Sequence, residues 1–315
     1  MRISRFGYAL SISAAALLAA CGGSQPPIGA PGAMRQTSAI AAHAERGTSW
    51  MLPDTSGEDL LYVAGEGGSV WVYTYPTGAL VGMLNVPDAE GECVDKAGDV
   101  YVTSELSVVE YAHGGTQPIA TLRVPGYTLS CSVDLKTGAL AVALLTNRTN
   151  GRGGVFIQGQ TYTDPLIFNV VSCGYDAHGN LFIDGIGKQT GKFKFAELPN
   201  GSGTFTAIEL NRRIQSARAE SIQSRGQYLA VEDSKTNVIY SFDIAGTYGF
   251  AKGKTKLTGA NGRQFWIQGA AVIEGESTNG AVGFWNYPAG GEPTKTITGP
   301  TTTIVGATVS LASSR

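Results

Sequence analysis

The chain has 315 residues, of which 43% are hydrophobic and 15% charged, and it contains 43 glycines and 13 prolines. Glycine and proline mark turns, so this balance predicts a turn-rich globular protein rather than a helical one. The 23 basic and 25 acidic side chains nearly cancel, which excludes the strongly basic surface of a nucleic-acid-binding protein.

The N-terminus has the order of parts found in a bacterial export signal. A positively charged start precedes an apolar run, residues 9–20, that is too short to span a bilayer. The run ends in Leu18-Ala19-Ala20-Cys21, which resembles the lipobox of bacterial lipoproteins. The resemblance implies that residues 1–20 are removed as a signal peptide and that Cys21 is lipidated. Several acyl chains, palmitate among them, would anchor the protein stably in the membrane.

Residues 21–50 are rich in glycine, proline, alanine and serine and show little apolar periodicity. This composition predicts a flexible tether between the lipid anchor and a folded domain. Gly22 follows the cysteine, at a position where aspartate retains many lipoproteins at the inner membrane. The resemblance therefore implies a location in the bacterial cell envelope, at the outer membrane.

Residues 93–102, CVDKAGDVYV, have two strand-like runs around a glycine turn, the pattern of a β-hairpin. Similar stretches recur along the chain, with fainter copies at both ends of the series. The copies cover residues 54–63, 131–142, 173–183, 221–231 and 264–273, and the turn glycines are Gly57, Gly98, Gly138, Gly179, Gly226 and Gly269. A period of roughly 40 residues with short strands predicts propeller blades, each a four-stranded sheet.

An aromatic-rich strand, a Pro/Gly turn and a further strand follow most of these hairpins, so each unit holds four strands, a to d. The first unit, residues 60–85, lacks strand a, whereas residues 304–312 form a strand without a partner. We expect the C-terminal strand to complete the first blade, because an open ring would expose two sheet edges. The sequence thus predicts an all-β fold for residues 51–315: a six-bladed β-propeller closed by a C-terminal strand joining the first blade.

The repeated D-x-x-G hairpin resembles six-bladed β-propellers of the NHL, YncE and SMP-30-like kind, in this case within a bacterial lipoprotein. Binders, enzymes and scaffolds share this unit, so it does not by itself give a function. Our first hypothesis is a monomeric, non-catalytic binding or scaffolding module at the cell envelope, without a cofactor, whose partner is a small ligand or an envelope protein. The alternative is an SMP-30-like lactonase or hydrolase, which the resemblance implies would hold a divalent cation through residues such as Glu92 and Glu220.

Residues with catalytic potential have structural interpretations. His113 and His178 lie in turns at non-equivalent places in the repeat, and we expect both to be exposed. No HExxH, GxSxG or CxxC spacing occurs, which argues against the common zinc, serine-hydrolase and redox sites. The aspartates that precede the turn glycines, Asp95, Asp134 and Asp176, are expected to cap their own turns.

Three cysteines remain after Cys21, so at least one stays free or pairs elsewhere. Cys131 and Cys173 align at the start of strand a, and Cys93 aligns one position further along the repeat. A Cys131–Cys173 bridge is one arrangement of neighbouring inner strands. We favour the other, in which the thiols are small buried hydrophobes near the axis.

Carboxylates follow strand b in five of the six units, at Glu66, Glu105, Asp184, Glu232 with Asp233, and Glu274 with Glu276. These b–c loops lie on the same face of a propeller as the residues before strand a. We interpret most of them as solvated loop charges. The sharper hypothesis is a site for a cation or cationic ligand over the axis on that face. Its candidate residues are Glu92, Asp184, Glu220, Asp233 and Arg263.

Overall fold

The computed structural model describes residues 48–148, 150–217, 219, 221–276, 280–299 and 303–313. The predicted signal peptide, Cys21, nearly all of the tether and Glu220 lie outside these residues. In the described part of the chain, η1 (Thr55–Gly57) is a single 3-10 turn. No helix there is long and apolar enough to cross a membrane.

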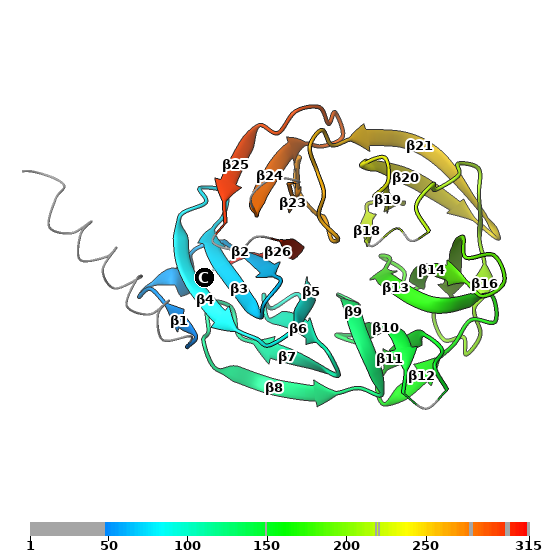
Figure 1. Ribbon diagram of the computed structural model, residues 1–315, viewed down its shortest axis with the longest axis horizontal. Coiled ribbons are helices and arrows are strands. Elements are labelled where there is room, and N and C mark those ends of the chain that lie inside the picture. Colours follow the sequence, from blue (N-terminus) through cyan, green and yellow to red (C-terminus); the bar gives the residue numbers. More distant parts are fainter. Residues whose placement is uncertain are drawn as a thin grey trace, which may run out of the picture. The chain divides into compact units, whose positions relative to one another are not determined.

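Six antiparallel sheets form a ring, and each is a blade of the predicted fold (Figure 1). Blades 2, 3, 4 and 6 have four strands each. From the axis outward, the strands are β5 (Ala89–Val94), β6 (Val100–Ser104), β7 (Ser107–Tyr111) and β8 (Pro118–Arg123) in blade 2; β9 (Gly126–Val133), β10 (Leu140–Asn147), β11 (Gly154–Ile157) and β12 (Gln160–Tyr162) in blade 3; β13 (Ile167–Tyr175), β14 (Leu181–Gly187), β15 (Phe193–Leu198) and β16 (Thr206–Ala207) in blade 4; and β22 (Trp266–Gln268), β23 (Ala271–Gly275), β24 (Ala281–Asn286) and β25 (Lys295–Thr298) in blade 6.

Blades 1 and 5 carry a fifth strand at the outer edge, which the repeat does not predict. Blade 1 is β26 (Ile304–Ser310), β2 (Leu60–Gly65), β3 (Ser69–Thr74), β4 (Leu80–Asn85) and β1 (Trp50–Met51). Blade 5 is β18 (Ile222–Arg225), β19 (Tyr228–Asp233), β20 (Val238–Ala245), β21 (Tyr248–Lys256) and β17 (Glu209–Leu210), with β17 parallel to β21. The short additions cover outer edges that would otherwise be open to pairing with another chain.

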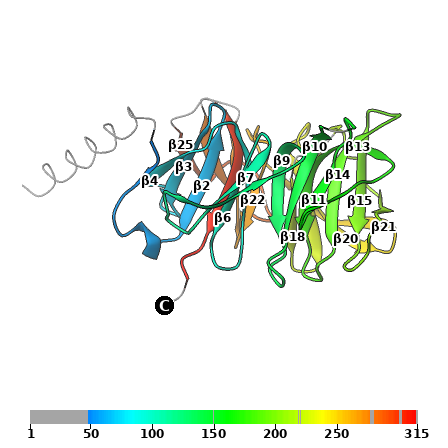
Figure 2. The same ribbon diagram turned by 90° about the horizontal axis from the view of Figure 1, so that it is seen from below.

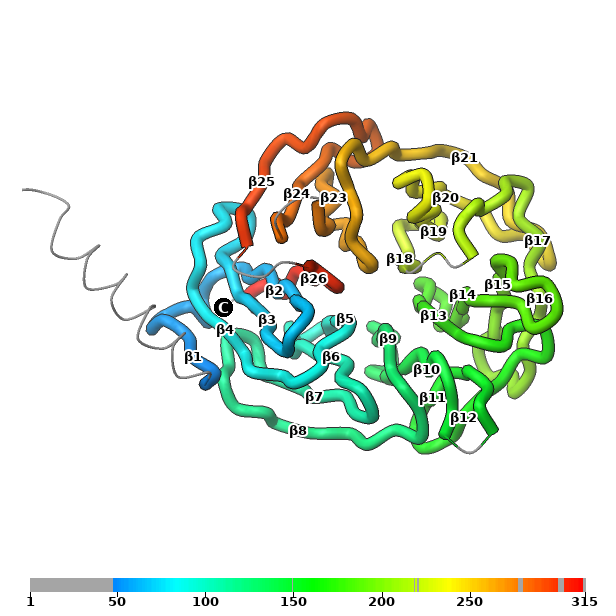
Figure 3. Tube along the Cα trace, in the orientation of Figure 1, coloured from blue at the N-terminus to red at the C-terminus, as the bar shows by residue number. Residues whose placement is uncertain are grey.

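The C-terminal strand closes the ring as predicted. Strand β26 pairs antiparallel with β2, from Leu60 opposite Ser310 to Gly65 opposite Ile304. Figure 3 shows β26 inside blade 1, with both chain ends of the ring in the same sheet. Every residue of β26 is buried, so closure contributes core as well as backbone pairing.

The turns between strands a and b confirm the predicted chemistry. Their glycines in blades 2 to 6 all have positive φ, which favours glycine over residues with a Cβ. Asp95 accepts hydrogen bonds from the N–H groups of Ala97 (2.8 Å) and Asp99 (2.9 Å). Asp134 and Asp176 cap their own turns in the same way. Gly57 differs because the first unit has no a–b turn, and it lies in η1 instead.

The hydrophobic core is divided into clusters between neighbouring blades. One cluster joins blades 1 and 2 through residues such as Leu60 and Val100, and another joins blades 3 and 4 through Ala141 and Ile183. Figure 2 shows the strands running between the two faces of the ring. We call the end that carries the turns at Gly98, Gly138 and Gly179 the a–b face, and the other end the b–c face.

Near the axis, polar side chains of one inner strand bond the backbone of another. Ser132 Oγ accepts a hydrogen bond from the N–H of Tyr175 at 3.0 Å, which joins blade 3 to blade 4. Gln223 joins blade 5 to blade 6, since its amide accepts from the N–H of Ile267 (2.6 Å) and donates to the Ile267 carbonyl (3.2 Å). These bonds satisfy inner-strand backbone groups that have no strand partner.

Gln264 makes a longer link, from blade 6 to blade 2 across β26. Its Oε1 accepts from the N–H of Glu92 at 2.9 Å and its Nε2 donates to the Glu92 carbonyl. The passage requires glycine at position 306, because a Cβ there would lie 2.9 Å from Gln264 Oε1 and 2.1 Å from Glu92 Oε2. The absence of a side chain at Gly306 thus leaves room for Gln264 of blade 6 to reach the backbone of Glu92 in blade 2.

A disulfide joins Cys93 of β5 to Cys131 of β9, with a Cα–Cα distance of 5.6 Å. The expectation that these two thiols are free is therefore wrong, and so is a Cys131–Cys173 bridge. Cys131 and Cys173 occupy equivalent positions, so their side chains point the same way around the ring, each toward the blade before it. Cys93 is one position out of step and points the opposite way, because successive strand residues alternate between faces. Cys173 remains free and buried.

Candidate functional site

A cavity of about 690 Å³ lies on the axis and opens at the a–b face. All six blades contribute to its wall, each through its inner strand or the residues that flank it. This volume falls in the range of small-molecule sites. The sequence hypothesis places a site at the opposite end of the axis, where Arg263 lines two cavities, one of about 30 Å³ beside Glu90 and one of about 490 Å³ beside Ser234.

The wall of the axial cavity is mainly apolar, with aromatic rings and a few hydrogen-bonding groups. Val133 and Ile222 are buried, and the partly exposed rings of Tyr175 and Trp266 also line the cavity. At the mouth, Leu135 is 60% exposed and Leu311 is 46% exposed. Large exposed apolar side chains beside an apolar cavity are typical of a binding surface.

Three cations also line the axial cavity: Lys96 and Lys136 are exposed, and Arg225 is half-buried. The guanidinium of Arg225 donates to the Gly269 carbonyl at 2.9 Å, which fixes it against blade 6. The aspartates of the mouth are occupied as turn caps. The mouth therefore presents an apolar surface edged by charges of both signs, with Lys96 and Lys136 exposed and the three aspartates bonded to their own turns.

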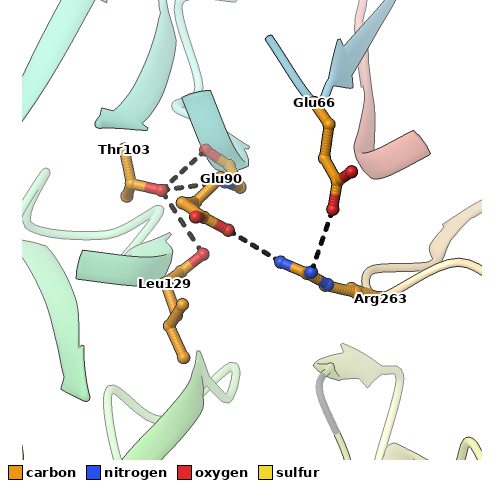
Figure 4. Close-up of polar contacts among 6 residues, drawn as sticks. Glu66, Glu90, Thr103, Leu129 and Arg263 are labelled. Atoms are coloured by element: carbon orange, nitrogen blue, oxygen red, sulfur yellow. Dashed lines mark hydrogen bonds and ion pairs between the residues drawn. The ribbon is translucent and has the colours of Figure 1, made fainter. Parts of the chain in front are cut away.

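On the b–c face, Arg263 bridges two carboxylates (Figure 4). Its guanidinium lies 3.0 Å from a carboxylate oxygen of Glu90 and 3.3 Å from one of Glu66. Burial raises the pKa of Glu90, although the Arg263 charge acts in the opposite direction. The guanidinium of Arg263 therefore forms ion pairs with two neighbouring glutamates.

Two carboxylates of the predicted site, those of Asp184 and Asp233, lie on b strands and are buried rather than solvated. Asp184 is 0% exposed and accepts hydrogen bonds from Ser172 Oγ and from the N–H of Ala219. Asp233, also 0% exposed, accepts from the N–H groups of Gln215 and Ser216 at 3.1 and 3.0 Å. Both carboxylates accept hydrogen bonds from backbone N–H groups of the connection that leads to β18, so they hold blades 4 and 5 together.

Glu232 and Glu274 occupy the position equivalent to Asp184 and are likewise buried. Glu274 Oε1 accepts from the N–H of Gly262 at 3.1 Å, before strand a of its own blade. Glu66 and Glu105 lie in exposed turns, as predicted for loop charges. The carboxylates that follow strand b are thus a mixture of structural caps and surface charges.

Glu92 is 0% exposed, and its carboxylate faces Gly306 at the seam of the ring. Within the described residues neither of its oxygens accepts a hydrogen bond of ordinary length and angle. Burial raises the pKa of Glu92 well above its ordinary value, and the backbone N–H of Ala64 offsets only part of that shift. Burial therefore favours the neutral form of Glu92, which does not line the axial cavity.

Replacing Glu92 by glutamine tests this protonation state. A carboxyl group whose pKa is raised on folding stabilises the protein only below its unfolded pKa, near 4.5, and loses that contribution as pH rises toward the folded value. Glu92→Gln removes the titration, so the variant should melt at a higher temperature than wild type at pH 8. The difference should shrink as pH falls toward 4.5. Thermal melts from pH 4 to 8, with Glu105→Gln as the exposed control, give the comparison.

No family model and no curated protein sequence matches the chain. Several solved structures are similar to it. A chain of the nidogen/laminin complex is 16% identical, with a TM-score of 0.63 over 81% of this chain and 99% of that one. A Bacteroides caccae protein of unknown function is 10% identical, with a TM-score of 0.58 over 80% and 99%. The β-propeller domain of Cps50 (Swd1) from Myceliophteria thermophila is 12% identical, with a TM-score of 0.50 over 81% and 86%.

The fold is a β-propeller. At these identities the likeness extends to the fold alone, since unrelated functions share this architecture. In this propeller the described residues contain no group of three or more His, Cys, Asp or Glu side chains placed to hold a metal ion.

The histidines differ from the sequence expectation in one case. His178 is exposed, as predicted, but His113 is half-buried in the propeller. Its Nδ1 lies 2.6 Å from Ser310 Oγ and its Nε2 lies 2.9 Å from the Glu58 carbonyl. His113 thus fastens blade 2 to the C-terminal strand. Burial raises the pKa of the Cys173 thiol to about 12, so that cysteine is not a reactive nucleophile at neutral pH.

Sequence reasoning missed the residues that line the axial cavity, because it sought charge in loops rather than periodicity in strand a. A signal was present in SCSVD (130–134) and SIQSR (221–225), where polar and apolar residues alternate. Some of those polar groups bond neighbouring inner strands, and the apolar residues between them line the cavity.

Proposed function

We propose that this protein is an envelope-anchored binding module whose propeller takes a ligand in the axial cavity from the a–b face. The observation that carries the proposal is the cavity of about 690 Å³ on the axis, built by all six blades. Its apolar wall and the exposed lysines at its mouth, Lys96 and Lys136, suit a ring-bearing ligand with an anionic or strongly polar end. The proposal includes membership of the NHL, YncE and SMP-30-like group, which rests on the repeated hairpin.

The anchored location is supported by two independent features of the chain. Leu18-Ala19-Ala20-Cys21 has the order of a lipobox, and the Cys93–Cys131 disulfide suits an exported, oxidising compartment. Mass spectrometry of the membrane fraction tests the anchor, and an unmodified Cys21 in the mature chain would contradict it.

Binding is favoured over catalysis by the positions of the candidate residues. Glu92, the described candidate for a metal ligand in the lactonase-like alternative, faces Gly306 and does not line the axial cavity. The aspartates at the mouth bond their own turns. Ser172 lines the cavity and donates to the Asp184 carboxylate, but both residues are buried, at 1% and 0% exposed, and neither His113 nor His178 lines the cavity to act as a base.

A fluorescent anilinonaphthalene sulfonate tests the axial cavity. Its fused rings can pack against the apolar wall, and its sulfonate can pair with the exposed lysines at the mouth. Ser224→Trp fills the cavity from β18, and Leu135→Glu adds charge at its mouth. Each variant should weaken dye binding at least about tenfold, a loss of about 1.4 kcal/mol. Leu166→Glu changes another exposed leucine, 48% exposed and outside the cavity wall, and should bind like wild type. Unchanged affinity in both cavity variants would refute the proposed site.

A further inference from the structure

A second cavity, of about 440 Å³, lies where blade 4 meets blade 5 on the b–c side of the ring. One wall is the start of β15, and the other is the connection that leads from β17 toward β18. Four cationic side chains line it: Lys192, Lys194, Arg212 and Arg213. Glu209 is the single acidic residue among the lining residues.

These four cations are not engaged with protein carboxylates. The ion pairs in the described residues involve Lys252 and Arg263, and none of the four cavity cations takes part in a side-chain hydrogen bond or ion pair there. The chain as a whole has a formal net charge of −2, so the cluster is a local excess of positive charge. Lys192, Arg212 and Arg213 are exposed and Lys194 is half-buried, and a cluster of cations without carboxylate partners creates a positive potential that attracts anions.

The connection that carries the two arginines is held in place on both sides of them. Before them, the N–H of Asn211 donates to the Gly249 carbonyl at 2.9 Å, and Asn211 Oδ1 accepts from the N–H of Ala251 at 2.8 Å. After them, Ile214 is 5% exposed, and the next two backbone N–H groups bond the buried carboxylate of Asp233. A fixed backbone lowers the entropy that the arginines lose when they close on a ligand.

Aromatic surface lies beside this charge. Phe193 and Phe195 both line the cavity, and their ring centroids are 6.2 Å apart in a stacked arrangement. Phe193 is only partly buried, whereas Phe195 is buried. The cavity thus combines an apolar wall for a ring with guanidinium groups, which bind phosphate oxygens in a bidentate manner.

We propose that this second cavity binds a phosphate-bearing ligand with two or more negative charges, such as a phosphorylated sugar or a phosphorylated lipid headgroup. The site is independent of the axial cavity and of what that cavity binds. A volume of about 440 Å³ admits a compact phosphorylated molecule. The buried Asp233 is a positioning residue for the site, since it fixes the arginine-bearing connection without facing the ligand.

Pyrophosphate is the probe for the shared chemistry, and isothermal titration calorimetry of the full chain is the measurement. Wild type should bind pyrophosphate, with affinity that falls as salt screens the attraction. Arg212→Gln with Arg213→Gln should weaken binding at least about tenfold, because each charge-assisted hydrogen bond contributes about that factor or more. Arg123→Gln with Arg148→Gln removes the same charge from exposed positions in blades 2 and 3 and should leave the affinity unchanged.

The proposal is overturned if wild type does not bind pyrophosphate at millimolar concentrations, if the Arg212/Arg213 variant binds it like wild type, or if the control pair weakens binding as much. Equal melting temperatures of the three proteins show that folding is not the cause. Vesicles that contain phosphatidic acid, whose phosphate monoester can carry two negative charges, then distinguish the source of the phosphate. Stronger vesicle sedimentation by wild type than by the Arg212/Arg213 variant indicates a lipid headgroup, whereas pyrophosphate binding without that difference indicates a soluble phosphorylated ligand.

Discussion

Deletion of residues 303–315 should abolish cooperative folding of the propeller at room temperature. Ile304, Val305 and Val309 are each at most 4% exposed, and burial of a side chain of this kind contributes about 2 kcal/mol. These three alone account for about 6 kcal/mol, which is comparable with the whole stability of a natural domain, about 5–15 kcal/mol. The deletion also exposes the inner edge of β2 to pairing with other chains.

Circular dichroism melts and size-exclusion chromatography measure this effect. The control deletion, residues 313–315, leaves all of β26 in place and, among the described residues, removes the hydrogen bond that Ser313 Oγ donates to the Ala97 carbonyl. It should shift the melting temperature by no more than a few degrees. If the longer truncation melted like the full chain and stayed monomeric, closure by β26 would not be what holds the ring together.

Ring closure could be predicted from the sequence because it follows from counting strands. The first unit lacks an inner strand, and the C-terminal strand has no unit of its own. Both observations are explained if the C-terminal strand is the inner strand of the first blade. The turn caps at Asp95, Asp134 and Asp176 were equally predictable, because an aspartate before a turn acts on its own neighbours. In both cases the determining contacts are local in sequence or fixed by the repeat.

The candidate site was less predictable because it depends on depth, which the repeat does not specify. Asp184 and Asp233 were assigned to solvated loops, but they lie within b strands and bond backbone groups of the connection between blades 4 and 5. An aspartate looks the same in the sequence whether it is solvated in a loop or buried in a strand, and only its depth below the surface differs. The axial cavity was missed for a related reason: its volume results from side-chain packing between six strands that are far apart in sequence.

The cysteines show that a correct alignment can still lead to the wrong pair. Aligned positions in neighbouring blades point in the same direction around the ring, so Cys131 and Cys173 cannot face each other. A cysteine one residue out of register points the other way, because side chains of a strand alternate between its two faces. The offset of Cys93 was visible in the sequence, and it determines the disulfide that the structure contains.

Loss of that disulfide should destabilise the propeller strongly. The cross-link closes a loop with a sequence separation of 38 residues, and the loop-entropy relation gives about 4 kcal/mol for a loop of that length. For a domain of this size, about 2–4 °C of melting temperature is lost per kcal/mol. Cys93→Ala with Cys131→Ala should therefore melt about 8–16 °C below wild type. The bond lies between the inner strands of blades 2 and 3, so its loss loosens the wall of the axial cavity as well.

Reduction separates the cross-link from the packing of the two side chains. Dithiothreitol should lower the melting temperature of wild type toward that of the double variant, and it should leave the double variant unchanged. Cys173→Ala retains the cross-link and loses only a buried thiol, so it should stay sensitive to reductant. Non-reducing peptide mapping should recover one linked pair, Cys93 with Cys131. If Cys173→Ala instead lost its response to reductant, Cys173 would be a partner in the bond, and the alternation of side chains that assigns Cys131 to Cys93 would not hold in these strands.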